Sequence, residues 1–153
     1  LVSAAFDILE KTKNSQKLVF PSDYLCNTSI ESKKKPVIFS KNEIKDGYMG
    51  LDIGPNSTKR FQSILNDAET IFWNGPMGVF ENKNYQEGTK RLASSIAELT
   101  EKGAESIIGG GDSASALRKY SLTKNVTHLS TGGGASLELL SGKTLPALQR
   151  LEI

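Results

Sequence analysis

The chain has 153 residues, of which 37% are hydrophobic and 24% charged, and its formal net charge is +2. This length suffices for a globular domain with a substantial core, and so small a charge surplus gives no reason to expect nucleic acid or a membrane as a partner. The one cysteine, Cys26, excludes an internal disulfide, and the one histidine excludes most histidine-based metal clusters.

No apolar run approaches the roughly 20 residues that a membrane span needs, and no signal peptide is recognisable. We therefore expect a cytoplasmic protein in which Cys26 is a buried apolar side chain. The first residue is not methionine, and helical spacing of apolar residues starts at once, so we expect a helix from residue 1 to about Lys13 and a piece of a longer protein.

The next elements are weakly patterned. Lys17–Phe20 predicts a strand that ends at Pro21. Residues 26–48 are polar and weakly patterned apart from a short apolar run at 37–39, and the lysine run at 33–35 predicts a solvated loop. Residues 49–53 predict the edge of a strand. Asn56 or Ser57 could cap the following helix, whose apolar face is expected to comprise Phe61, Ile64, Leu65 and Ala68.

The second half repeats a clearer unit of strand, glycine-rich turn and helix. Strands are expected at 70–73, 105–108 and 126–129. Helices are expected after each turn, the first with Tyr85, Leu92, Ile96 and Leu99 inward and an end at Gly103, the second at 114–120, and the third at 135–140 with an end at Gly142. This alternation predicts an α/β fold, with a parallel sheet flanked by helices in a Rossmann-like three-layer sandwich.

The three turns are the most informative feature of the sequence. They read WNGPMGVFE at 73–81, IGGGDS at 108–113 and STGGGAS at 130–136. Glycine permits a close approach to backbone amides, and the helix that starts at such a turn adds unpaired N–H groups and a positive dipole end. Because all three turns follow strands of one parallel sheet, they should meet at its carboxyl edge and bind a polyphosphate.

Asp112 adds a carboxylate beside the second turn. A hard oxygen ligand next to bound phosphates suits magnesium, although Asp112 or Ser113 could equally be a helix cap, and Asp112 could be both. The sequence has no P-loop motif, no dinucleotide fingerprint with its acidic residue, and no serine–histidine–acid pattern. His128 and Trp73 are interpreted as structural residues, with Trp73 in the core.

These motifs closely resemble the C-terminal, nucleotide-binding half of phosphoglycerate kinase. The resemblance rests on residues 73–81, 107–112 and 128–140, on MGLDIGP at 49–55, and more weakly on 18–23 and 142–146. It covers the chain almost end to end, so residues 1–153 are expected to form part of the C-terminal domain of a two-domain kinase. It implies reversible phosphoryl transfer between 1,3-bisphosphoglycerate and ADP, giving 3-phosphoglycerate and MgATP in glycolysis, by an enzyme that is monomeric at full length.

The resemblance also implies roles for individual residues. Gly50 and Leu51 should line the adenine slot with Pro76 and Val79, and Glu81 should bind the ribose hydroxyls. Phosphate contacts are implied for Asn74, Gly110, Gly111 and Ser113, where the family usually has threonine in place of Ser113. Asp112 should hold magnesium. The amides of Gly132, Gly133 and Gly134 should point toward the phosphoryl group in transfer, so that Gly111 and Gly134 are the candidates for a catalytic role.

The family's N-terminal domain and its lysine-bearing glycine loop are not recognisable in this sequence, so we expect the chain to be inactive alone. We also expect an unpaired sheet edge and an uncovered apolar face, and hence self-association. Two alternatives remain open at this point. One is a non-enzymatic adenine-nucleotide-binding module of the same fold, and the other is a phosphate-binding dehydrogenase domain.

Overall fold

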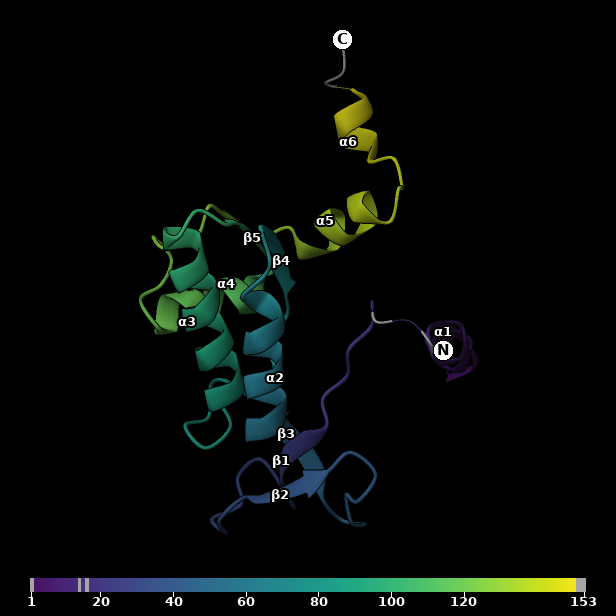
Figure 1. Ribbon diagram of the computed structural model, residues 1–153, viewed down its shortest axis with the longest axis vertical. Coiled ribbons are helices and arrows are strands. Elements are labelled where there is room, and N and C mark those ends of the chain that lie inside the picture. The colour runs from purple at the N-terminus through teal and green to yellow at the C-terminus, as the bar shows by residue number, and fades with distance from the viewer. Residues whose placement is uncertain (1, 14, 16, 151–153) are drawn as a thin grey trace.

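The computed structural model describes residues 2–13, 15 and 17–150. Its helices are α1 (Val2–Thr12), α2 (Pro55–Leu65), α3 (Glu87–Glu101), α4 (Gly111–Lys119), α5 (Gly133–Leu140) and α6 (Pro146–Gln149). Its strands are β1 (Asp23–Asn27), β2 (Val37–Ser40), β3 (Met49–Ile53), β4 (Thr70–Asn74), β5 (Glu105–Gly109) and β6 (His128–Ser130). The α/β class predicted from the sequence is confirmed (Figure 1).

A parallel three-stranded sheet of order β4-β5-β6 positions the second half of the chain. Its register pairs Asn74 with Gly109 and Gly109 with Ser130. The three strands therefore end in one row, and the turns that follow them leave the sheet at the same edge. The β-branched and aromatic residues of β4 suit this buried position, since Ile71 and Trp73 are each 6% exposed.

A second, antiparallel sheet of order β2-β1-β3 lies below the ends of α2 and α3 in Figure 1. The expected strand edge at 49–53 is confirmed as β3. The weakly patterned residues 26–48 include the end of β1 and, at the short apolar run, β2, neither of which was predicted. The strand expected over Lys17–Phe20 was wrong, because the structure has no strand there. Val19 instead packs at an apolar groove beside α2. Pairing with distant strands decides these short elements, and local patterning does not show it.

Helices α2 and α3 run side by side in front of β4 and β5 (Figure 1). The predicted inward face of α3 is confirmed, because Leu92, Ile96 and Leu99 are buried. The core between sheet and helices comprises Ile71, Trp73, Phe80, Ala93, Ile96, Leu99, Ile108, Ala116 and Leu117. The predicted apolar face of α2 is less covered, with Ile64 50% exposed.

The helix ends follow the prediction in part. Gly103 and Gly142 take positive φ angles of 108° and 80° after α3 and α5, as expected of left-handed helix ends. The predicted side-chain caps were wrong. The residue before the first turn is Gly54 in α2 and Gly110 in α4, and a glycine has no side chain that could accept a capping hydrogen bond. Helix α1 has no buried residue and stands apart from the body of the molecule (Figure 1).

Candidate functional site

The sheet register brings the three glycine-rich turns together. The Gly110 amide donates a hydrogen bond to the Ser130 carbonyl at 3.0 Å, which joins the second turn to the third. The Gly75 amide donates to the Ser113 hydroxyl at 2.7 Å, which joins the first turn to the second. We call this assembly of residues 74–75, 109–113 and 130–134 the glycine cradle.

The side chain of Asn74 lies at the centre of the glycine cradle. A Cβ atom added at Gly133 would be 2.5 Å from Asn74 Oδ1 and 2.8 Å from Gly110 Cα. A Cβ at Gly110 would be 3.0 Å from the same oxygen, and Gly110 has a φ of +93°, which favours glycine. Packing within the protein therefore explains the glycines at 110 and 133.

Gly111 and Gly134 differ from these two, because an added Cβ would meet no atom of the described structure within 4 Å. Gly111 is the first residue of α4, and Gly134 is the second residue of α5. Amides in the first turn of a helix have no partner within that helix, and its dipole makes this end positive. Two such helix starts face the cradle, so it can bind an anion with several oxygens.

Asp112 lies in the first turn of α4 and is exposed, so its carboxylate is free to reach a ligand beside the cradle. Within the described residues, no group of three or more histidine, cysteine, aspartate or glutamate side chains could hold a metal ion. Magnesium is commonly bound by one or two carboxylates together with substrate phosphate oxygens and water. A single carboxylate next to a turn that presents unpaired helix N–H groups fits that donor set.

Ser113 holds two turns together. Its side chain is fully buried, and its oxygen accepts the Gly75 amide. This contact lies within the glycine cradle, and the phosphate contact that the resemblance implies for Ser113 stays a prediction. Gly133 is likewise buried, whereas Gly132 and Gly134 are exposed.

A pocket of about 400 Å³ adjoins the cradle along the loop that follows β4. All four residues expected at an adenine slot, Gly50, Leu51, Pro76 and Val79, line it. The Val79 amide donates to the Leu51 carbonyl at 2.8 Å, so the two walls are hydrogen bonded. Tyr24 of β1 contributes to the same lining, a residue that sequence patterning does not single out.

Asp52 joins this pocket to α3. Its side chain is 3% exposed and accepts hydrogen bonds from the amides of Gly88, at 2.8 Å, and Ile53, at 2.9 Å. Burial raises the pKa of Asp52 to about 6, although these two hydrogen bonds favour the charged form. A Cβ at Gly78 would come within 2.4 Å of its carboxylate, so Asp52 packs directly under the loop that carries Pro76 and Val79.

Glu81 follows the pocket loop and is exposed. The Lys119 ammonium, from the last turn of α4, donates to the carbonyl oxygens of Phe80 at 2.6 Å and Glu81 at 3.4 Å. Neighbouring Tyr120 donates its hydroxyl to the Gln86 carbonyl at 3.4 Å. Burial, with the charges of Asp52, Glu87 and Glu81, raises the pKa of Tyr120 to about 12.

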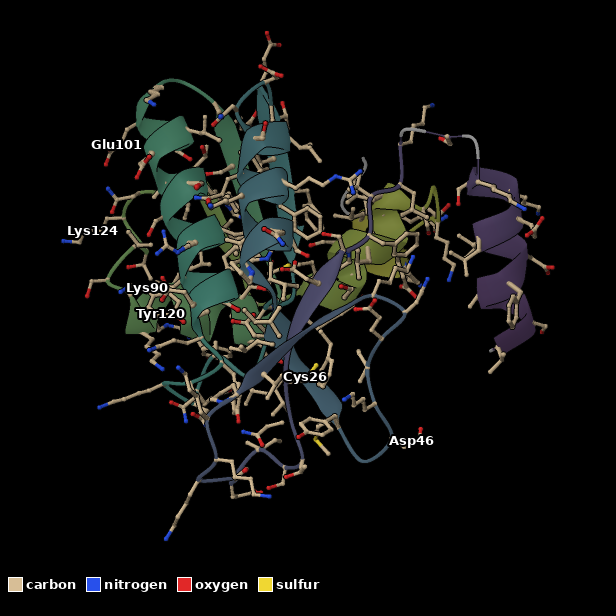
Figure 2. The ribbon with its side chains drawn as sticks, turned by 60° about the horizontal axis from the view of Figure 1, so that its bottom comes forward. Cys26, Asp46, Lys90, Glu101, Tyr120 and Lys124 are labelled. Atoms are coloured by element: carbon tan, nitrogen blue, oxygen red, sulfur yellow. The ribbon has the colours of Figure 1, made fainter. Side chains whose placement is uncertain are left out.

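The sequence did not assign roles to Asp52, Lys119 or Tyr24, since each acts through partners far away in the chain. Other interpretations are confirmed: Trp73 is in the core and Cys26 is fully buried, within β1 (Figure 2). Burial also raises the pKa of the Cys26 thiol. His128 is exposed at the start of β6.

Comparison with known proteins agrees with this architecture. A family model of phosphoglycerate kinase matches residues 1–143. The chain is 50% identical over 135 residues to a phosphoglycerate kinase of Acaryochloris marina, covering 88% of this chain and 34% of that protein. It is 53% identical over 135 residues to one of Mycobacterium leprae, with 88% and 32% covered. The chain thus spans about a third of the length of the curated relatives that it matches.

Solved structures show the same fold. The phosphoglycerate kinase of Coxiella burnetii superposes with a TM-score of 0.85 at 36% identity, covering 96% of this chain and 38% of that one. The enzyme of Pyrococcus horikoshii gives 0.81 at 33% identity, with 99% and 36% covered. Across the described residues, no helix has the length and apolar character to cross a membrane. The extent of the family match and the identity to these relatives show that the chain belongs to the phosphoglycerate kinase family.

Proposed function

We propose that this chain forms much of the nucleotide site in the C-terminal domain of a cytoplasmic phosphoglycerate kinase. The full-length enzyme would transfer a phosphoryl group reversibly between 1,3-bisphosphoglycerate and ADP, giving 3-phosphoglycerate and ATP. The observation that carries the proposal is the register of β4, β5 and β6, which brings the three turns together. The loop that follows β4 belongs to the first of these turns and also lines the pocket.

In this proposal each part of the site binds one part of the nucleotide. The pocket between Leu51 and Val79 accepts adenine, and Glu81 accepts hydrogen bonds from the ribose hydroxyls. The amides of the first turn of α4, from Gly111 onward, bind the phosphates, and the helix dipole favours their negative charge. The Gly110 backbone lies beside them, with its amide donating to the Ser130 carbonyl. Preorganised amides are effective here because they need no rearrangement as charge develops.

The start of α5 is assigned to the group being transferred. In this proposal the amides of Gly132, which precedes α5, and of Gly133 and Gly134 point toward the transferred phosphoryl group and stabilise negative charge on its oxygens. The Gly132 amide also donates to the Ser130 hydroxyl at 3.1 Å. Magnesium, held by Asp112 and phosphate oxygens, supplies charge neutralisation when it is bound. In-line transfer also requires the second substrate to be fixed opposite the nucleotide, so we expect no turnover by this chain alone.

Calorimetric titration with MgADP tests the assignment. Glu81→Ala and Asp112→Ala should each weaken binding about 10-fold, since each removes a charged contact worth about 1.5 kcal/mol. Asp67→Ala is the matched control, because this exposed carboxylate lies before β4, at the opposite end of the sheet from the cradle. Binding that is indifferent to both site substitutions would contradict the assignment. Tighter binding of NADH than of MgADP would favour a dehydrogenase domain.

A further inference from the structure

Lys119 connects two parts of the site that are far apart in the sequence. It is on the last turn of α4, the helix whose first turn carries Gly111 and Asp112. Its ammonium reaches the carbonyl oxygens of Phe80 and Glu81 at 2.6 and 3.4 Å. One helix therefore contacts the cradle at its start and the end of the pocket loop at its other end.

The contact lies where the loop changes from buried to exposed. Phe80 is 5% exposed and belongs to the core, whereas Glu81 is exposed. The Asn82 amide donates to the Val79 carbonyl at 3.0 Å and so closes a turn around Phe80 and Glu81. The Lys119 ammonium adds a contact to the two carbonyl oxygens within that turn, and this contact fixes the backbone from which the Glu81 side chain leaves. A lysine ammonium supplies a charge-assisted hydrogen bond, which is stronger than a neutral one.

We propose that Lys119 is a positioning residue for ribose recognition: its ammonium fixes the Phe80–Glu81 backbone and thereby directs the Glu81 carboxylate at the ribose hydroxyls. This inference rests on the proposed function, which assigns the ribose contact to Glu81. Lys119 itself touches neither nucleotide nor phosphate in this role. It ties the ribose contact to the helix that binds the phosphates, so the two contacts keep a fixed separation.

If this is correct, removal of the Lys119 ammonium should weaken selectively the recognition of the ribose hydroxyls. Loss of the ammonium leaves adenine and phosphate binding in place and weakens the contribution of the ribose hydroxyls. The affinity for 2′,3′-dideoxy-ADP, a nucleotide without those hydroxyls, should therefore not change when Lys119 is replaced. A general loss of structure would weaken both nucleotides alike.

The test compares Lys119→Met with Arg118→Met by calorimetry against MgADP and magnesium 2′,3′-dideoxy-ADP. Arg118 is an exposed residue on the same turn of α4, so its replacement removes the same charge. Lys119→Met should weaken MgADP binding about 3- to 10-fold and dideoxy-ADP binding less than about 2-fold, as expected for one charge-assisted hydrogen bond. Lys119→Arg, which keeps a donor, should restore most of the preference for ADP.

Equal weakening of both nucleotides by Lys119→Met, or no effect on either, would overturn the proposal. Glu81→Ala distinguishes a failure of this inference from a failure of the proposed function. If Glu81→Ala leaves the preference for ADP over dideoxy-ADP unchanged, the assignment of Glu81 to the ribose is wrong.

Amide hydrogen exchange tests the Lys119 contact without any nucleotide. Lys119→Met, but not Arg118→Met, should speed exchange at Val79, Phe80 and Asn82, whose amides are hydrogen bonded within this loop and to β3. Unchanged exchange would show that Lys119 does not hold the loop.

Discussion

At the scale of single residues, the site depends on a buried carboxylate. Asp52 accepts two backbone hydrogen bonds and packs against Gly78 and Gly88, where an added Cβ would lie 2.4 Å from its oxygen. Burial raises its pKa to about 6, and the neighbouring charge of Glu87 acts in the same direction. The Asp52 side chain thus joins β3, the pocket loop and the start of α3. This position destabilises its charged form, because the carboxylate is held away from water.

This raised pKa gives Asp52 a defined effect on stability. An ordinary aspartate has a pKa of 3.8, so the folded state binds the proton more tightly than the unfolded state. The contribution to folding is therefore fully present below pH 3.8 and is lost as pH rises through 6, by up to about 3 kcal/mol. Urea unfolding at pH 4.5 and 7.5 should show Asp52→Asn gaining stability relative to wild type at the higher pH. Asp67→Asn serves as the control, and an equal difference at both pH values would contradict the raised pKa.

Gly133 and Gly134 lie in the same turn but differ in how closely the protein packs around them. Gly133→Ala should destabilise the protein by about 1–3 kcal/mol, because its Cβ would overlap Asn74 Oδ1 and the Gly110 backbone. Gly134→Ala meets open space and should leave stability within about 0.5 kcal/mol, or raise it slightly, since alanine favours a helix. Thermal unfolding measures both variants. A similar loss of stability in the two would show that the turn is uniformly packed.

At the scale of elements, α2 begins on a contact from another part of the chain. The Asp23 carboxylate accepts the amides of Asn56 at 3.0 Å and Ser57 at 2.7 Å, and the Ser57 hydroxyl at 2.5 Å. Burial acts to raise the pKa of Asp23, but these hydrogen bonds outweigh it, and the pKa is lowered. A strand residue thus serves as the helix cap that the sequence seemed to offer in Asn56 or Ser57.

Removal of this cap should destabilise the chain. Asp23→Ala leaves two amides of α2 without their partner, with an expected loss of about 1–3 kcal/mol at pH 7. Because the pKa is lowered on folding, the contribution is present above pH 3.8 and is lost as pH falls below it. Urea unfolding checks the size of the effect, with Asp46→Ala, on the exposed β2–β3 loop (Figure 2), as the control. Equal stability of the two variants would show that α2 needs no cap from β1.

The elements predicted correctly from the sequence have local signals. Helix α3 shows its apolar period in Leu92, Ile96 and Leu99, and β4 shows its aromatic and β-branched run. The three turns were predicted to meet because parallel strands end at one edge, and the register agrees. By contrast, β1 pairs with β3 across 22 to 29 positions, and the Asp23 cap and the Lys119 contact each span more than 30, so no local pattern encodes them.

At the scale of the whole molecule, the outer strands β4 and β6 of the parallel sheet each have an edge that is unpaired within the described residues. Strand β4 pairs with β5, and none of the strands in the described ranges pairs with its other edge. An apolar groove of about 350 Å³ runs beside it, with Phe61, Ile64, Leu65, Ile71, Met77 and Ile96 among its lining residues. An open strand edge next to an apolar groove favours pairing with another chain.

We therefore expect this chain to self-associate through the β4 groove as its concentration rises. Ile64→Glu places a charge in the groove at a side chain that is 50% exposed, so it should reduce association while changing stability by less than about 1 kcal/mol. Leu148→Glu, at a 40% exposed position on α6, is the matched control and should leave association unchanged. Sedimentation velocity over a range of concentrations measures the effect. If the wild-type chain sediments as a monomer at every concentration, the open edge and the groove do not mediate association. If Leu148→Glu abolishes association and Ile64→Glu does not, the contact lies on the C-terminal helices instead.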